Sequence, residues 1–179
     1  WITVAEVVPV TLGVLLIGIL AGALPTEAML IALALLGAML GFAPFNRPVA
    51  RLFLGDVGSL PIGLLLFWLL TLLAISGHLV AAIILPLYYV ADATLTLLRR
   101  ILRGEPFWQA HRTHFYQRAI DRGFTVPEVV TRVFVVNLGL VVLALTSAVM
   151  PGLPAAFSSL AAAAALVAWL ILTLARGKQ

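Results

Sequence analysis

The sequence contains no cysteine and few charged residues. Without cysteine, a disulfide framework and a thiolate metal site are both excluded. Charged residues make up 10% of the 179 residues, whereas a soluble domain carries about a quarter. Mean hydropathy is +1.16, and 63% of the residues are hydrophobic. The composition therefore indicates a membrane protein without a soluble domain.

Long apolar runs take the place of the missing charges. A helix that spans a bilayer needs about 20 apolar residues, and the sequence has several runs near that length. We predict an all-α, polytopic membrane helix bundle, one integral-membrane domain over residues 1–179 with about six transmembrane helices. The first run is not a signal peptide, because no basic segment precedes it and the next run follows at once. The predicted spans are residues 7–24, 27–43, 60–77, 79–98, 129–150 and 155–175.

Basic residues are missing from the first, third and fifth connections between these spans. All eleven Lys and Arg residues lie in or beside the second connection, the fourth connection or the C-terminal tail. Because basic loops face the cytoplasm, residues 44–59 and 99–128 are predicted to be cytoplasmic loops, and both termini cytoplasmic. Nucleic acid binding is not expected, since the charge sits at membrane ends. Part of it is expected to attract anionic lipid headgroups.

The second connection contains a carboxylate between glycines. Gly55 and Gly58 flank Asp56 and would let a ligand approach the backbone, and Ser59 can cap the following helix. A helix start attracts anions, and Mg²⁺ takes one or two carboxylates together with phosphate oxygens. We interpret this loop as a metal and phosphate site; a Gly-Asp turn whose Asp caps the helix is the open alternative. Asn46 could contact a sugar or base, although a role in holding the loop is preferred.

Asp92 is an acid within the fourth apolar run. A carboxylate in hydrocarbon needs a partner or a wet cavity. Asp92 is therefore either an accessory acid of an inward-facing site or one half of a structural pair with an Arg or a hydroxyl on a neighbouring helix.

The fourth connection is rich in basic and aromatic residues. After Pro106 it is predicted to form an interfacial helix up to Gly123, with imidazoles and guanidiniums on one stripe. Such a stripe suits a phosphate-rich ligand; a basic helix that only lies on the membrane is the alternative. Zinc is not expected, because His-x-x-His without cysteine or a nearby acid is a weak metal pattern. The stripe consists of His111, His114, Phe115, Arg118 and Arg122.

Two separated stretches resemble the polyprenyl-phosphate N-acetylhexosamine-1-phosphate transferases (glycosyltransferase family 4). Residues 44–59, Pro-Phe-Asn-Arg-Pro-Val-Ala-Arg-Leu-Phe-Leu-Gly-Asp-Val-Gly-Ser, are similar to one family signature. Residues 111–118, His-Arg-Thr-His-Phe-Tyr-Gln-Arg, are similar to the family's histidine-rich cytoplasmic loop, and residues 92–107 resemble the span and exit before it. These bacterial enzymes begin the lipid-linked synthesis of peptidoglycan, O-antigen, teichoic acid and related polymers.

The resemblance implies a reaction and a set of site residues. The implied reaction transfers a sugar 1-phosphate from a UDP-N-acetylhexosamine to undecaprenyl phosphate, a polyprenyl phosphate lipid, and releases UMP. It depends on Mg²⁺, with Mn²⁺ as the alternative ion, and takes place at the bacterial inner membrane. Asp56 matches the motif aspartate that acts at the metal and the pyrophosphate. His114 matches the first histidine of the loop motif, which contacts nucleotide or phosphate, and Arg118 matches its closing basic residue. Further substrate contacts are expected from Asn46, Gly55, Gly58, Ser59 and His111, and a homodimer is left open.

The chain also departs from the family pattern. Tyr116 and Gln117 stand where further histidines are common, which points to a branch for O-antigen-type sugars, as in lipopolysaccharide biosynthesis. The family's Asp-Asp-x-x-Asp and Asn-x-x-Asp-Gly segments are absent, so the chain is expected to be the C-terminal half of such an enzyme and inactive alone. The alternatives are a non-catalytic membrane fragment and a transporter-like bundle with Asp92 as coupling acid. Transport is disfavoured, because the polar residues cluster in loops rather than on broken helices at mid-membrane.

Overall fold

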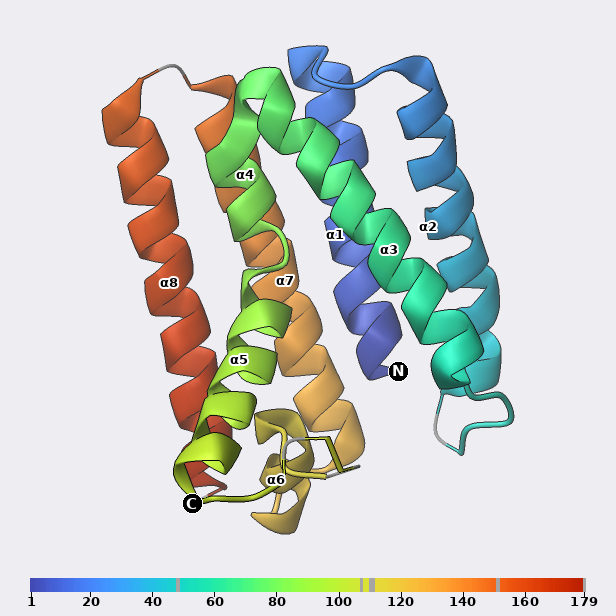
Figure 1. Ribbon diagram of the computed structural model, residues 1–179, viewed down its shortest axis with the longest axis vertical. Coiled ribbons are helices and arrows are strands. Elements are labelled where there is room, and N and C mark those ends of the chain that lie inside the picture. The colour runs from blue at the N-terminus through green and yellow to red at the C-terminus, as the bar shows by residue number, and fades with distance from the viewer. Residues whose placement is uncertain (48, 107, 110–111, 151, 179) are drawn as a thin grey trace.

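The regular structure of the chain is helical. The computed structural model describes residues 1–179 except Pro48, Phe107, Ala110, His111, Pro151 and Gln179. Within the described residues, long helices run up and down one bundle, which confirms the predicted all-α membrane architecture (Figure 1). The elements are α1 (Ile2–Ala21), α2 (Thr26–Asn46), α3 (Gly55–Leu73), η1 (Ala74–His78), α4 (Leu79–Ile84), α5 (Leu87–Leu102), α6 (Phe115–Asp121), α7 (Val126–Val149) and α8 (Leu153–Arg176).

Most of the bundle is built from membrane-length helices. In the described part of the chain, five helical stretches are long and apolar enough to cross a membrane: Ile2–Ala21, Thr26–Asn46, Gly55–Ile84, Val126–Val149 and Leu153–Arg176. Large apolar side chains such as Leu64, Phe67 and Leu172 point outward from them. An outer surface of this kind suits hydrocarbon rather than water.

The predicted span over residues 79–98 is divided into two pieces. Gly77, with φ 96°, makes the turn that ends the ascent of α3, and α4 leads back down. The helix is interrupted at Pro86, because proline lacks the N–H that would continue the helical hydrogen bonds. Figure 1 shows α5 continuing the path of α4. Together α4 and α5 form the descent that we predicted as one helix.

The centre of the bundle is α1, which packs against α7 and α2. Two-thirds of its apolar window is buried inside the protein, whereas only 17% of the Gly55–Ile84 window is. A polar contact joins α1 to α7: the side-chain amide of Asn137 donates to the Ala5 carbonyl at 3.0 Å and to the Glu6 carboxylate at 3.2 Å. Neither side chain was predicted to have a role, although an acid at the edge of an apolar run is a signal for a polar contact in the membrane.

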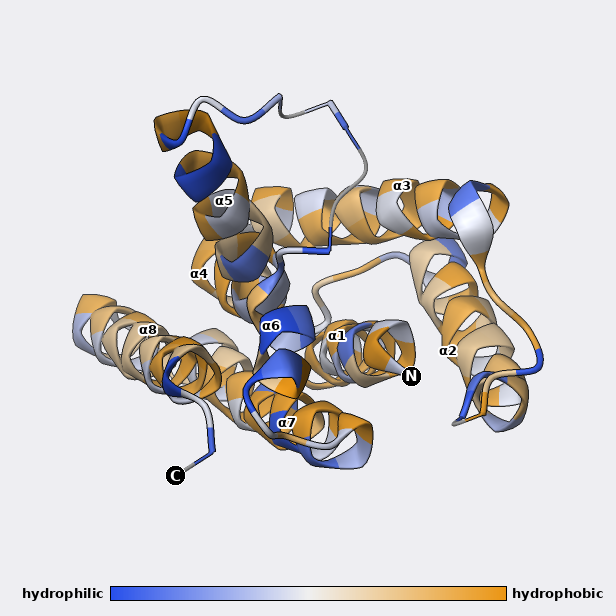
Figure 2. Cartoon of the chain, turned by 90° about the horizontal axis from the view of Figure 1, so that it is seen from below, coloured by the Kyte–Doolittle hydropathy of each residue, from blue (hydrophilic) through white to orange (hydrophobic). Residues whose placement is uncertain are grey.

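Polar segments gather at one end of the bundle. The connection between α2 and α3, the connection between α5 and α6, and the C-terminus lie at the lower end in Figure 1. The view from below shows the hydrophilic parts of α5, α6 and the start of α7 at this end (Figure 2). The two connections predicted to carry the site therefore share one end of the molecule.

Candidate functional site

The aspartate of the second connection lies in a helix rather than before one. Helix α3 begins at Gly55, where we expected a start near residue 60, so the connection shortens to residues 47–54. Gly55 has φ 55°, a left-handed conformation that glycine adopts without strain. Asp56 is exposed in the first turn, where its negative charge interacts favourably with the helix dipole.

The other residues of this motif shape the start of α3. A Cβ atom at Gly58 would lie 2.3 Å from Leu54 Cδ2, so glycine makes room for the side chain that precedes the helix. Ser59 does not cap α3, which contradicts that expectation, because the helix already includes it and Leu54 is the N-cap. A substrate contact of Ser59 stays a prediction.

Asn46 joins the end of α2 to the loop that follows. Its Nδ2 donates to the Leu52 carbonyl at 2.8 Å, and its Oδ1 accepts from the backbone nitrogen of Trp1 at 2.6 Å. The backbone N–H groups of Arg51 and Leu52 donate to the Phe45 carbonyl. Both ends of the Asn46 amide thus bind protein groups, which supports its preferred role in holding the loop.

The helix of the fourth connection is shorter than predicted. Helix α6 covers Phe115–Asp121, and His114 is its N-cap rather than a residue inside it. Phe115 and Arg118 lie in the helix and Arg122 follows it, so the predicted stripe is wrong for these described residues. His111, the remaining member, lies outside the described residues.

Asp92 binds the start of α6. Its Oδ2 lies 2.6 Å from His114 Nδ1, and its Oδ1 accepts from the backbone N–H of Phe115 at 2.8 Å. Asp92 is 5% exposed, while the His114 side chain is 27% exposed. Of the two readings of Asp92, the structural pair is therefore observed, although its partners are a histidine and a backbone N–H rather than an arginine or hydroxyl.

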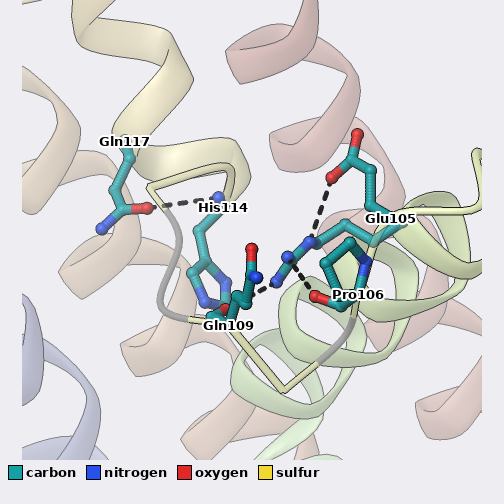
Figure 3. Close-up of polar contacts among 6 residues, drawn as sticks. Glu105, Pro106, Gln109, His114 and Gln117 are labelled. Atoms are coloured by element: carbon teal, nitrogen blue, oxygen red, sulfur yellow. Dashed lines mark hydrogen bonds and ion pairs between the residues drawn. The ribbon is translucent and has the colours of Figure 1, made fainter.

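Arg100 organises the loop between α5 and α6. The buried guanidinium donates to Glu105 Oε2 at 3.1 Å and to the carbonyls of Pro106 at 2.7 Å and Gln109 at 3.2 Å (Figure 3). The same figure shows the Gln117 side chain accepting from the His114 backbone N–H at 3.3 Å. No role was predicted for Arg100, because no sequence pattern distinguishes it from the adjacent Arg99.

Several guanidiniums gather around α6. The pKa of Arg118 is lowered, first because the side chain loses some water and then because Arg122, Arg99 and Arg103 repel an added charge. The Arg99 guanidinium lies 4.7 Å from the centre of the Phe115 ring. This positive field favours an anion beside α6. A surface hollow there is lined by Arg112, Gln117, Ile120 and Asp121.

The structure brings some of the predicted residues together and leaves others apart. Asp92, His114 and Arg118 lie on or beside one short helix. Asp56, in the first turn of α3, lies at the same end of the bundle, but among the described residues no hydrogen bond or ion pair joins it to His114. The described residues also contain no group of three or more His, Asp or Glu side chains able to hold a metal ion. A shared site for Asp56 and His114 stays a prediction.

Comparison with known proteins gives partial matches. Residues 2–74 match the sequence model of a family described as Glycosyl transferase family 4. A phospho-N-acetylmuramoyl-pentapeptide-transferase of Rhodopseudomonas palustris (strain BisA53) is 34% identical over 121 residues, which are 64% of this chain. A protein of the same name from Limosilactobacillus fermentum (strain NBRC 3956 / LMG 18251) is 53% identical over 38 residues, 21% of this chain. No solved structure matches the chain.

The matched regions are short parts of these relatives. They span 31% of the Rhodopseudomonas protein and 12% of the Limosilactobacillus protein. The chain therefore spans less than a third of the length of the curated relatives that it matches.

Proposed function

We propose that this chain belongs to glycosyl transferase family 4 and that it contributes to the transfer of a sugar 1-phosphate from a UDP-N-acetylhexosamine to polyprenyl phosphate, with release of UMP. The name of the two relatives favours an N-acetylmuramoyl-type donor, whereas nothing in their names supports the O-antigen-type sugar predicted from Tyr116 and Gln117. We further propose that the bundle spans the inner membrane of a bacterium and that its basic end faces the cytoplasm.

Phosphoryl transfer of this kind depends mainly on positioning and on charge stabilisation. Asp56, in the first turn of α3, lies beside backbone N–H groups that favour a phosphate. His114 and Arg118 contact the diphosphate from the side of α6, within the field of the neighbouring guanidiniums. Asn46 acts by holding the connection to α3 rather than by touching the sugar.

A magnesium ion fits this proposal only with help from other ligands. Mg²⁺ accepts one or two protein carboxylates and takes its remaining ligands from water and substrate phosphates. Asp56 is exposed and supplies one carboxylate, and no cluster of three acids or histidines accompanies it in the described residues. When bound, the ion would neutralise phosphate charge. We propose that transfer needs more carboxylates than Asp56 supplies.

The proposal rests on the match to the family together with the position of the two motif connections in the fold. Both motif connections lie at the basic end of a membrane bundle, where a water-soluble nucleotide sugar and a lipid phosphate can meet. A transporter would instead use Asp92 as a coupling acid. That role is disfavoured, because each Asp92 carboxylate oxygen already binds a protein group.

The test is UMP release, in lipid nanodiscs containing undecaprenyl phosphate, by a protein that contains residues 1–179 together with the acidic segments expected of the family. We expect release with UDP-N-acetylglucosamine or with UDP-N-acetylmuramoyl-pentapeptide, and a loss of about 10²–10³-fold in Asp56→Asn, the range for removal of one electrostatic contact to the transition state. The control variant Glu27→Gln removes an exposed carboxylate from the opposite end of the bundle and should leave UMP release unchanged. No release with either donor, or wild-type release by Asp56→Asn, would refute the proposal.

A further inference from the structure

A buried carboxylate and a partly exposed imidazole form a pair that connects the membrane part of the bundle to the proposed site. Asp92 belongs to α5, and His114 precedes α6. The two residues are separated by 22 positions in sequence, yet Asp92 Oδ2 lies 2.6 Å from His114 Nδ1. The second oxygen, Oδ1, accepts from the backbone N–H of the next residue, Phe115.

We propose that Asp92 is a positioning residue: it holds His114 in the tautomer with the proton on Nδ1, so that Nε2 is the nitrogen through which the ring meets a phosphate ligand. The assignment of the ligand rests on the proposed function. The assignment of the tautomer rests on the contacts of Asp92 alone.

The tautomer follows from the chemistry of the two partners. An ionised carboxylate only accepts hydrogen bonds, so a nitrogen 2.6 Å away must carry the proton. Hydrogen bonds to a charged partner are short and about twice as strong as neutral ones. Asp92 is 5% exposed, so water does not compete well for its oxygens, and the contact with Phe115 N–H fixes the carboxylate in place. The pair is therefore a rigid contact.

The surroundings fix the orientation of the ring as well. The His114 and Tyr116 rings are stacked, with centroids 5.5 Å apart and planes inclined by 22°. Phe115 is buried, and the Arg99 guanidinium covers its ring, which anchors the start of α6 against α5. The side chain of Gln117 accepts from the His114 backbone N–H. Backbone and ring of His114 are thus held by separate contacts.

The arrangement has a consequence for phosphate binding. With Nδ1 donating to Asp92, Nε2 of the neutral ring carries the lone pair and accepts a hydrogen bond from a protonated phosphate oxygen. A doubly protonated ring would instead donate from Nε2 to an ionised phosphate oxygen. A carboxylate that binds the far nitrogen of a functional histidine fixes its tautomer and orientation in the same way at metal sites.

The test is ¹⁵N NMR spectroscopy of the full-length protein in liposomes with ¹⁵N-labelled histidine. His78, His111 and His114 are the histidines of this chain, and loss of signals in His114→Gln assigns the third. We expect His114 Nδ1 to show the shift of a protonated nitrogen and a coupling to its hydrogen at neutral pH. A lone-pair shift at Nδ1 in the wild-type protein would overturn the proposal without any variant.

The variant Asp92→Asn tests whether Asp92 determines the tautomer of His114. The asparagine oxygen can still accept from Phe115 N–H, but its amide donates to Nδ1, so the proton of His114 should move to Nε2. UMP release should fall by about 10- to 100-fold, the loss that follows removal of the corresponding partner at metal-bound histidines. The matched control is Thr96→Val, which changes another buried polar residue of α5 and should leave both the ¹⁵N shifts and UMP release unchanged.

The outcomes separate this inference from the proposed function. Reversal of the tautomer in Asp92→Asn supports the positioning role, even if no donor sugar yields UMP; in that case only the proposed function fails. Active protein whose His114 shifts do not change in Asp92→Asn would contradict the positioning role and leave the proposed function intact. The same NMR change in Thr96→Val would also contradict it, because the effect would then be a general response to changes in α5.

Discussion

Replacing Arg100 should loosen the loop between α5 and α6 without unfolding the bundle. The guanidinium donates to Glu105, to the Pro106 carbonyl and to the Gln109 carbonyl, so a single side chain holds three residues of this loop. The Glu105 side chain is 39% exposed, and its ion pair therefore contributes little. The two contacts with carbonyls, made by a charged donor that is itself 6% exposed, contribute about 1.5 kcal/mol each.

The loss of about 3 kcal/mol should increase the open population of this loop on the order of 100-fold. Hydrogen–deuterium exchange of the segment over residues 103–109, measured by mass spectrometry in nanodiscs, reports that population, because the backbone N–H groups of Arg103, Gly104 and Glu105 are hydrogen-bonded there. Arg100→Met should speed exchange of this segment. Arg100→Lys should also speed it, because an ammonium cannot reproduce the guanidinium fork.

Arg103→Met is the matched control, since Arg103 is exposed on the same turn and should leave exchange unchanged. Exchange of residues 103–109 within twofold of wild type in Arg100→Met would refute this explanation of the loop. A similar acceleration in helices α1 and α7 would also count against it, because the predicted opening is local.

Three further predictions concern stability. Asn137→Leu removes the contacts from α7 to Ala5 and Glu6 of α1. A hydrogen bond between membrane helices contributes about 0.6–1.7 kcal/mol, so Tm should fall by about 1–7 °C in a thermal scan. Gly177→Ala should lower Tm by about 2–4 °C, because Gly177 has φ 90° and a Cβ would lie 2.9 Å from Arg122 Cβ; an unchanged Tm would show that the tail does not pack on Arg122. Burial, with Asp92 and Glu6 nearby, raises the pKa of Tyr116 above 10.0, so the unfolded chain ionises this phenol first and the stability of the fold decreases as pH rises above that value. Tyr116→Phe should therefore reduce the dependence of unfolding free energy on pH in the alkaline range. An equal dependence in the variant and the wild type would contradict the pKa shift.

The helices that the sequence predicted best are those decided by composition. A run such as residues 129–150 must become a spanning helix, because a membrane leaves the backbone no other way to satisfy its polar groups. The break in the fourth descent had a visible cause in Pro86, but the apolar run around it is continuous, and we predicted one helix. Hydropathy measures burial in lipid and does not detect a missing backbone hydrogen bond.

The fourth connection shows the limit of reasoning from local pattern. A spacing of three and four residues predicted one helix through His111, His114 and Arg118, whereas α6 begins only at Phe115. That start coincides with the contacts of Asp92, which lies on another helix and 22 residues away from His114. Similarly, the role of Arg100 depends on carbonyl groups whose directions no sequence pattern encodes.

The most direct measurement of the central claim is a double-mutant cycle between Asp56→Asn and His114→Gln, with the Kd of the UDP-N-acetylhexosamine donor measured by calorimetry in nanodiscs. If the two connections hold the same diphosphate, the effects should be coupled by about 0.5–3 kcal/mol, the range for residues that share a partner. Independent effects that add to within about 0.3–0.5 kcal/mol would contradict a common site for Asp56 and His114.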